Sequence, residues 1–309
     1  MLTVTIPHVE LLEGLGSLPD GVRLVLWDLV GPLDVLAADV DVVVVPNYFV
    51  DPEGFRVLES LPRLRMVQLP SAGYEHALQQ IPAHVTVCNG RGVHDAGTAE
   101  LALALTLASQ RGINDAVRDM SDGTWRPELR SSLADRRVMV LGYGSVGAAV
   151  GRRLEAFEAE VVRVARTARQ APEGLVHGVD ELPGLLPDVD ILIVTLPLTE
   201  ETHSLVNAKV LAALPDGALL VNVGRGMVVD TGALLAELTS GRLRAALDVT
   251  EPEPLPANHP LWRAPNVIIT PHVGGYSNAT TPRLVALLRR QIEALAAGDP
   301  PENVVRAGK

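Results

Sequence analysis

The sequence predicts an α/β protein built from two doubly wound parallel-sheet domains. Short apolar segments rich in β-branched residues alternate with helical segments along most of the chain, which is typical of parallel strands covered by helices. The length of 309 residues suits about two such domains. A third observation locates one of them. Residues 138–150 combine an apolar strand, the turn Gly142-x-Gly144-x-x-Gly147 and the start of a helix, which is the order of a dinucleotide-binding turn.

The composition excludes several classes of partner. A net charge of −11 argues against nucleic acid or an anionic membrane as the main partner. The sequence contains no run of about 18 apolar residues, so we expect no membrane span. The N-terminus lacks the pattern of a signal peptide. Cys88 is the only cysteine, which rules out an intramolecular disulfide and fits a reducing, cytoplasmic location. We expect Cys88 to be a buried strand residue, and the pattern predicts no metal site.

The first domain is predicted from five apolar runs and the helices between them. Strands bounded by Pro, Gly, Asp or Asn are expected at 2–6, 22–27, 40–45, 64–69 and 85–88. One of the intervening helices is expected at 52–60. Residues 98–109 are apolar almost all round, so we expect a helix that is buried on most sides and crosses between the domains.

The second domain is predicted to begin near Arg136. Its strands are expected at 138–141, 160–164, 191–195, 218–223, 245–249 and 267–270, with helix stop signals at 215–217 and 240–241.

A last helix is predicted at 281–297, with Thr281 as its cap, Pro282 in its first turn and Gly298 at its end. No strand is expected after it. Its apolar stripe consists of Leu284, Leu288, Ile292 and Leu295, and we expect this stripe to pack back on the first domain. Residues 98–277 would then form a dinucleotide-binding domain, inserted in a substrate domain made of 1–97 and 278–309, with a cleft between the two.

Each glycine of the turn has a separate physical role. Gly142 permits the tight turn, Gly144 lets the backbone approach a pyrophosphate, and Gly147 lets the helix pack close to the strand. The helix N-terminus, at Ser145 and Val146, offers N–H groups and a partial positive charge to the phosphates. The turn therefore predicts a bound dinucleotide.

Charged side chains follow three apolar strands of the second domain. They are Arg225 in Asn-Val-Gly-Arg-Gly, Asp248 and Glu253 in Asp-Val-Thr-Glu-Pro-Glu, and His272 in Thr-Pro-His-Val-Gly-Gly. In an open α/β sheet, ligands bind beyond the carboxyl ends of the strands. Arg225 can hold a carboxylate by two parallel hydrogen bonds. His272, oriented by Glu253, can give a proton to a carbonyl oxygen as a hydride reaches the carbon.

Each of these residues also has a plain structural explanation. Arg225 could be a surface charge, Glu253 a loop charge between prolines, and His272 a turn residue. Their joint occurrence beside a dinucleotide turn favours catalysis. The remaining histidines lack such neighbours and are expected to be structural; they are His8, His76, His84, His94, His177, His203 and His259.

Six stretches together resemble the D-isomer-specific 2-hydroxyacid dehydrogenase family over nearly the whole chain. They are Leu-Pro-Ser-Ala-Gly at 69–73, Gly-Tyr-Gly-Ser-Val-Gly at 142–147, Leu-Pro-Leu-Thr-Glu-Glu-Thr at 196–202, Val-Asn-Val-Gly-Arg-Gly at 221–226, Leu-Asp-Val-Thr-Glu-Pro-Glu-Pro at 247–254 and Asn-Val-Ile-Ile-Thr-Pro-His-Val-Gly-Gly at 266–275. The resemblance implies a Rossmann dinucleotide domain inserted in a flavodoxin-like substrate domain, and a homodimer.

The resemblance also implies the roles of individual residues. Arg225 would hold the substrate carboxylate, His272 would be the acid/base and Glu253 its partner. Backbone N–H groups at Ala72 and Gly73 would hold the same carboxylate. The resemblance further implies that Asp248 binds the nicotinamide amide and that the cofactor site is lined by Leu196, Pro197, Val223 and Gly274.

The sequence departs from the commonest family pattern after the strand at 160–164. An acidic residue that binds the ribose diol of NAD is expected there. Ala165 stands in its place, followed by Arg166, Thr167 and Arg169. These cations suit a 2′-phosphate, so we predict that NADP is preferred and that NAD is possible. The alternative is that both arginines are surface charges and that the backbone alone holds the ribose.

The predicted function is hydride transfer between NADPH (or NADH) and a small 2-keto acid or D-2-hydroxy acid, such as glyoxylate or hydroxypyruvate. Two other activities of the family are disfavoured. Formate dehydrogenases carry Gln at the position of Glu253, and phosphite dehydrogenases carry Lys at the position of Ala72. Two alternatives stay open. One is an NAD-dependent enzyme similar to phosphoglycerate dehydrogenase, although we expect no regulatory domain after the last helix. The other is a nucleotide-sensing dimeric interaction protein without turnover.

Overall fold

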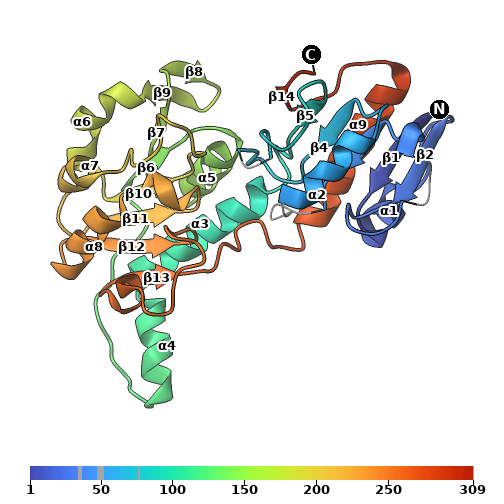
Figure 1. Ribbon diagram of the computed structural model, residues 1–309. Coiled ribbons are helices and arrows are strands. Elements are labelled where there is room, and N and C mark those ends of the chain that lie inside the picture. The colour runs from blue at the N-terminus through green and yellow to red at the C-terminus, as the bar shows by residue number, and fades with distance from the viewer. Residues whose placement is uncertain (34–36, 47–51, 76, 309) are drawn as a thin grey trace. The chain divides into compact units, whose positions relative to one another are not determined.

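The computed structural model describes residues 1–33, 37–46, 52–75 and 77–308, so that His76 lies outside the described residues. The chain divides into two compact units (Figure 1). Unit 1 comprises Met1–His94 and Ser277–Lys309, and unit 2 comprises Asp95–Tyr276. The predicted boundaries were 97/98 and 277/278. Among the described residues, no helix has both the length and the apolar character that crossing a membrane requires.

Unit 1 contains a sheet in the order β14-β5-β4-β3-β1-β2. Its parallel strands are β1 (Leu2–Ile6), β2 (Val22–Leu26), β3 (Val42–Val44), β4 (Met66–Gln68) and β5 (Thr86–Cys88), which confirms the five predicted strands. The order 2-1-3-4-5 is that of flavodoxin-like folds. The prediction that no strand follows the last helix is wrong, because β14 (Val304–Arg306) pairs antiparallel with β5. Two valines are too short a run to show a strand pattern, and the pairing comes from a strand far away in the sequence.

Helices cover both faces of this sheet. In β3, Val42 and Val44 join one core cluster and Val43 joins the other, as the two-residue period of a strand requires. The first cluster receives apolar side chains from α1 (Val9–Leu15) and α9 (Thr280–Ala297). The second receives them from α2 (Pro52–Arg56) and the 3₁₀ turn Val57–Ser60.

The last helix, α9, differs from its prediction only at its start. It ends before Gly298, whose φ of 83° is the left-handed conformation that favours glycine. The predicted cap is wrong, because the helix begins at Thr280 after Ala279, so that Thr281 lies inside the first turn. The predicted stripe packs in the core of unit 1, where Leu284, Leu288 and Ile292 are buried.

Unit 2 contains a sheet in the order β13-β12-β11-β10-β6-β7-β9-β8. Its parallel strands are β6 (Arg137–Leu141), β7 (Glu160–Ala165), β9 (Gly174–Gly178), β10 (Ile191–Val194), β11 (Leu219–Asn222), β12 (Arg244–Leu247) and β13 (Val267–Ile269). Counted from β6, this order contains the Rossmann arrangement 3-2-1-4-5-6. The six predicted strands are confirmed. Strand β9 and the edge strand β8 (Arg169–Ala171), which pairs with it antiparallel, were not predicted, because both are short and contain few apolar residues.

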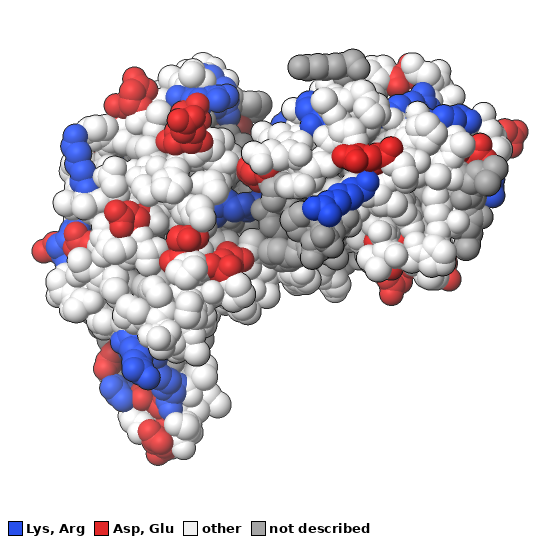
Figure 2. Space-filling view, viewed as in Figure 1, with Lys and Arg blue, Asp and Glu red and all other residues white. Residues whose placement is uncertain are grey.

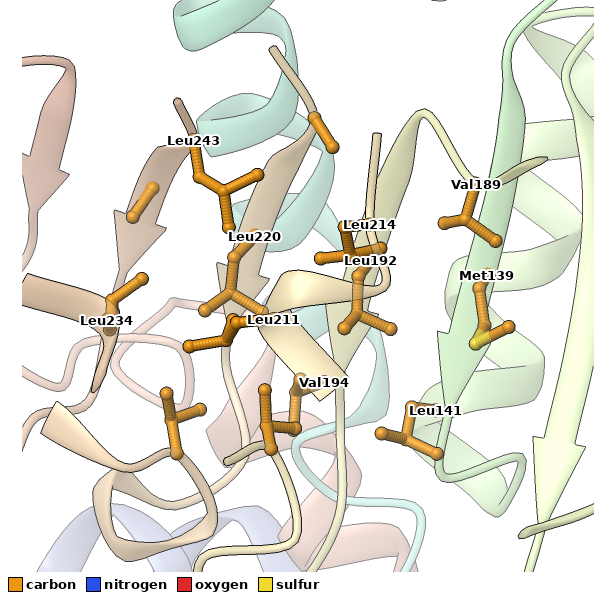
Figure 3. Packing of buried hydrophobic residues seen from close by; sticks show 14 of the residues in the cluster. Met139, Leu141, Val189, Leu192, Val194, Leu211, Leu214, Leu220, Leu234 and Leu243 are labelled. Atoms are coloured by element: carbon orange, nitrogen blue, oxygen red, sulfur yellow. The ribbon is translucent and has the colours of Figure 1, made fainter. Parts of the chain in front are cut away.

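Successive residues of the central strands of unit 2 face opposite sides of the sheet. Met139, Leu141, Leu192 and Val194 lie in the cluster of Figure 3, together with Leu211 and other residues of the covering helices. Those helices are α6 (Leu182–Leu185), α7 (Ala208–Ala212) and α8 (Thr231–Thr239). The alternate strand residues pack instead with α3 (Asp95–Arg111) and α5 (Ser145–Ala156). The apolar helix expected at 98–109 is α3, and it belongs to unit 2.

Unit 2 also carries a projecting segment, residues 112–130, which we call the arm. Its helix α4 (Ile113–Ser121) contains no buried residue. Ion pairs tie α4 to the segment that returns to the sheet, with Arg126 at 2.6 Å from Asp119 and Arg130 at 3.0 Å from Asp115. Basic and acidic side chains gather together at this end of unit 2 in Figure 2. The arm was not predicted, because its shape depends on these ion pairs and not on an apolar core.

Candidate active site

The turn between β6 and α5 depends on the absence of side chains at its glycines. Gly142 has a φ of 111°, and a Cβ there would lie 2.9 Å from the Leu196 nitrogen. A Cβ on Gly147 would lie 2.3 Å from the carbonyl oxygen of Gly142, so α5 can approach β6 only because residue 147 is glycine. Around the Cβ position of Gly144, no described atom beyond the chain neighbours lies within 4 Å. The N-terminus of α5 is therefore open to a ligand, and its N–H groups suit a pyrophosphate.

Tyr143, between the first two glycines, fixes this turn and was not singled out from the sequence. Its ring is buried, and a Cβ on Gly151 would lie 2.9 Å from its hydroxyl. Arg163 of β7 lies over the ring, 5.7 Å from the centroid, and donates from Nε to the hydroxyl at 3.2 Å. Arg169 of β8 donates to the Tyr143 carbonyl oxygen at 2.6 Å. Gly151 was the available signal, because a further glycine inside a helix marks a close neighbour.

The two arginines beyond β7 have different surroundings, although both are exposed. The pKa of Glu201 is lowered chiefly by a hydrogen bond from Thr199 and in smaller part by the positive charge of Arg166. Arg166 therefore has an acidic neighbour. Arg169 is hydrogen-bonded to a neutral carbonyl group at the glycine turn.

The loop after β11 positions Arg225. Asn222 is buried, its Oδ1 accepts from the Gly224 N–H at 3.0 Å, and its Nδ2 donates to the Arg225 carbonyl at 3.0 Å. A Cβ on Gly224 would lie 2.6 Å from the carbonyl oxygen of Leu196. A Cβ on Gly226 would lie 1.8 Å from the carbonyl oxygen of Thr250. These close approaches fix the backbone on both sides of Arg225. Because Leu196 contacts both the glycine turn and this loop, it joins the two parts of the site.

Asp248, directly after β12, organises the next loop. Its carboxylate accepts hydrogen bonds from the Thr270 hydroxyl at 2.6 Å, the Val273 N–H at 2.9 Å and the Gly274 N–H at 2.9 Å. Its carbonyl oxygen accepts from the His272 N–H at 2.8 Å. Asp248 was predicted to bind the nicotinamide amide. In the structure, its carboxylate holds the backbone on both sides of His272.

His272 and Glu253 are brought together by loops that leave neighbouring strands, β13 and β12. The Nδ1 atom of His272 is hydrogen-bonded to Oε1 of Glu253. Their side chains are 25% and 32% exposed, so the pair is partly shielded from water but reachable by a small molecule. A carboxylate on Nδ1 fixes the orientation of the ring and directs Nε2 the opposite way.

The remaining predicted residues follow three different strands. In unit 2, the Pro197 carbonyl accepts from Thr202 at 2.7 Å, and Val223 is buried at the end of β11. In unit 1, the loop at Ala72 and Gly73 packs against the end of β5, where Asn89 Nδ2 donates to the Ala72 carbonyl at 2.7 Å. The described residues contain no group of three or more His, Cys, Asp or Glu side chains that could hold a metal ion.

Comparison with known proteins agrees with this geometry. Residues 103–274 match the family model for the NAD-binding domain of D-isomer specific 2-hydroxyacid dehydrogenases. The chain is 31% identical to a glyoxylate reductase of Korarchaeum cryptofilum, over 95% of this chain and 92% of that protein. It is 34% identical to glyoxylate/hydroxypyruvate reductase B of Pectobacterium atrosepticum, over 80% of this chain and 81% of that protein.

Solved structures show the same relationship. A D-isomer specific 2-hydroxyacid dehydrogenase from Xanthobacter autotrophicus, in complex with NADPH and MES, superposes with a TM-score of 0.84 at 32% identity, covering 98% of this chain and 97% of that one. An NADPH-dependent glyoxylate/hydroxypyruvate reductase from Sinorhizobium meliloti, in complex with NADP and sulfate, also gives a TM-score of 0.84, at 26% identity and with 99% and 98% of the two chains covered. The chain belongs to the D-isomer specific 2-hydroxyacid dehydrogenase family.

Proposed function

We propose that this protein reduces small 2-keto acids with a nicotinamide cofactor, and that glyoxylate and hydroxypyruvate are its first candidate substrates. The observation that carries the proposal is the hydrogen bond between His272 and Glu253, on loops of the same sheet that holds the glycine turn. The relatives named glyoxylate reductase and glyoxylate/hydroxypyruvate reductase support this substrate class.

The residues divide the chemistry between them. When bound, the nicotinamide supplies the hydride that reaches the carbonyl carbon. His272, held through Nδ1 by Glu253, gives the proton from Nε2 to the carbonyl oxygen, which becomes a hydroxyl. Arg225 binds the substrate carboxylate and stabilises the charge that develops on the oxygen. The N–H groups at Ala72 and Gly73 hold the same carboxylate.

The proposal is tested by following the loss of reduced-nicotinamide absorbance. Glyoxylate, hydroxypyruvate and pyruvate are each supplied with NADPH and with NADH. Turnover of glyoxylate or hydroxypyruvate is the expected result. No oxidation of either cofactor with any of the three acids would refute the proposed substrate class.

We also propose that NADP is preferred over NAD. Support comes from the sequence beyond β7, where Ala165 replaces the acidic residue that would bind the ribose diol and two arginines follow. Of these, Arg169 is hydrogen-bonded to the glycine turn itself, through the Tyr143 carbonyl. The relatives from X. autotrophicus and S. meliloti were solved with NADPH and NADP, respectively.

The cofactor proposal is tested by the ratio of kcat/KM for NADPH to that for NADH. We expect a ratio above one in the wild type and a decrease of about tenfold or more in Arg166→Ala and Arg169→Ala, since each removes a charged hydrogen bond to phosphate. Arg152→Ala is the matched control, because Arg152 is an exposed arginine on α5 whose partner is Glu173. A wild-type ratio of one or less would refute the preference.

We further propose that the protein is a homodimer whose subunits contact each other through the arm. Val117, Met120 and Trp125 are 60%, 77% and 94% exposed. Val117 and Met120 lie at helical spacing from the exposed Ile113, so that the three residues make an apolar face on α4. An exposed apolar face of this kind marks an interaction site. A second copy is the fitting partner because symmetric dimers present the same patch twice.

The other readings are less well supported. Nothing favours the enzyme similar to phosphoglycerate dehydrogenase over the reductase, whose named relatives match most of the chain. A sensor without turnover would not need a histidine that is oriented by a carboxylate, as His272 is by Glu253. The buried free thiol of Cys88 fits a reducing compartment, which supports the expected cytoplasmic location.

A further inference from the structure

We infer that Asn89 is a positioning residue, which holds the peptide between Ala72 and Gly73 so that the Gly73 N–H faces the substrate carboxylate. The inference rests on the proposed function, in which this loop binds the carboxylate. Asn89 follows β5 and is 3% exposed. A buried amide side chain must have its hydrogen bonds satisfied, so its partners reveal what it holds in place.

Three consecutive carbonyl groups of the loop are held within unit 1. The Gly90 N–H donates to the Ser71 carbonyl at 2.7 Å, Asn89 Nδ2 donates to that of Ala72 at 2.7 Å, and the Ser71 hydroxyl donates to that of Gly73 at 3.0 Å. In a trans peptide the C=O and the following N–H point in opposite directions. The two bonds from Gly90 and Asn89, which follow β5, therefore turn the N–H groups of Ala72 and Gly73 away from the end of β5.

The N–H groups that are turned in this way include that of Gly73. Neither the Ala72 N–H nor the Gly73 N–H donates to any described residue, whereas the next one, of Tyr74, donates to Glu75 at 2.9 Å. Gly73 is buried, and an unsatisfied buried N–H is rare in native proteins. Successive N–H groups on one side of a loop form an anion site, and a carboxylate supplies the missing acceptors.

The orientation of the Asn89 amide follows from its other contacts. Its Oδ1 accepts from the Arg91 N–H at 3.3 Å, which leaves Nδ2 facing the Ala72 carbonyl. The Asn89 N–H donates to the Asn303 carbonyl at 3.0 Å. A Cβ on Gly90 would lie 2.2 Å from the Pro70 carbonyl oxygen, so the loop packs directly on the end of β5. Asn89 is thus a fixed support for the Ala72 carbonyl.

The test compares Asn89→Asp and Asn89→Ala with the wild type. The first is nearly isosteric but sets a carboxylate oxygen against the Ala72 carbonyl, and the second removes the donor without adding charge. We expect KM for glyoxylate to rise about 10- to 100-fold in Asn89→Asp and about tenfold in Asn89→Ala, because hydrogen bonds to the substrate carboxylate are weakened. Since this binding is equal in ground and transition states, kcat should change less than about threefold, and KM for NADPH should not change.

Asn303→Asp is the matched control. The Asn303 amide donates to the Arg91 carbonyl at 3.1 Å, so this variant adds the same charge close by without removing the bond to Ala72. Its KM for glyoxylate should equal that of the wild type. Oxamate binding to the enzyme with NADH, measured by calorimetry, should weaken in the two Asn89 variants alone.

The outcomes separate this inference from the proposed function. An unchanged KM in both Asn89 variants, or a loss of kcat at unchanged KM, would overturn the positioning role. An equal rise of KM in Asn303→Asp would overturn it as well, because charge alone would then explain the effect. If Asn89→Asp does not fold, as judged by its melting curve, Asn89→Ala decides alone. A wild-type enzyme that reduces no 2-keto acid would instead refute the proposed function, and this inference with it.

Discussion

His272 combines an unusual backbone conformation with a side-chain hydrogen bond to Glu253. Its φ of 53° is left-handed, which is uncommon for a residue other than glycine. Such a conformation costs about 1–3 kcal/mol and persists only where the surroundings impose it. The hydrogen bonds of Asp248 to residues 270, 272, 273 and 274 supply that constraint. The result is an imidazole whose position is set by its own backbone and by Glu253 together.

His272→Ala should lower kcat by about 10²- to 10⁴-fold, the usual size of general acid–base catalysis. Binding of NADPH, measured by fluorescence titration, should not change, because the glycine turn is untouched. His203→Ala is the control, since His203 is an exposed histidine of the same unit. A kcat for His272→Ala within a few fold of the wild type would remove His272 from the reaction.

Cys88 should be unreactive in the folded protein. Burial raises the pKa of its thiol to about 11, whereas an unfolded cysteine titrates near about 8.5. Because the folded state holds the proton more tightly, Cys88 contributes full stability below about pH 8.5 and loses it as the pH rises towards 11. A thiol reagent at about pH 8 should therefore label the protein only after denaturant is added. Rapid labelling of the native protein would contradict this burial.

At the scale of elements, the sequence predicted what depends on local pattern. Most strands of the two sheets are short apolar runs bounded by turn residues, and the glycine turn follows one of these runs, so these strands and the turn were found. Strands β8 and β14 were missed because they are edge strands defined by pairing with a neighbour and not by an apolar face. Strand β9 lies between β7 and β8, and it was missed because it is short and contains few apolar residues. Arg225, Glu253 and His272 were found as residues that follow strands. Tyr143 and Asn89 were not, because their importance lies in contacts with residues distant in the sequence.

Gly147→Ala tests the packing of α5 on β6. The new methyl group would lie 2.3 Å from a backbone oxygen that cannot move without deforming the turn. We expect a loss of stability of about 1–3 kcal/mol, as for other overpacked sites, and weaker binding of NADPH. Gly184→Ala is the matched control, because Gly184 lies in α6 and its Cβ position has no described neighbour within 4 Å. Equal melting temperatures of the two variants would contradict the steric argument.

At the scale of the whole molecule, the exposed apolar face of the arm is the surface through which we propose that two subunits associate. Ion pairs such as Arg126–Asp119 give the arm its form without burying any residue of α4. Exposed ion pairs contribute little stability, so contact with a second subunit would add much of what keeps the arm ordered. Assembly would therefore stabilise unit 2 without a direct effect on the glycine turn.

Val117→Asp should convert the proposed dimer into a monomer, because a charge in an apolar interface must be desolvated. Light scattering after size-exclusion chromatography measures the mass directly. Val9→Asp is the control, since Val9 is an exposed valine on α1 of unit 1. A wild-type protein that is monomeric at all concentrations would refute the dimer, and a dimeric Val117→Asp variant would move the interface elsewhere.

The division of unit 1 into two separated stretches of chain has a consequence for biosynthesis. Its core needs Leu284, Leu288 and Ile292 of α9, and its sheet is completed by β14. The ribosome makes these residues only after the whole of unit 2. Domains generally fold as units while synthesis proceeds, so unit 2 can fold on the ribosome before unit 1 is complete. During that time the part of the unit 1 core that α9 covers stays exposed to solvent. The N-terminal stretch is thus the part of the nascent chain that most needs protection by chaperones.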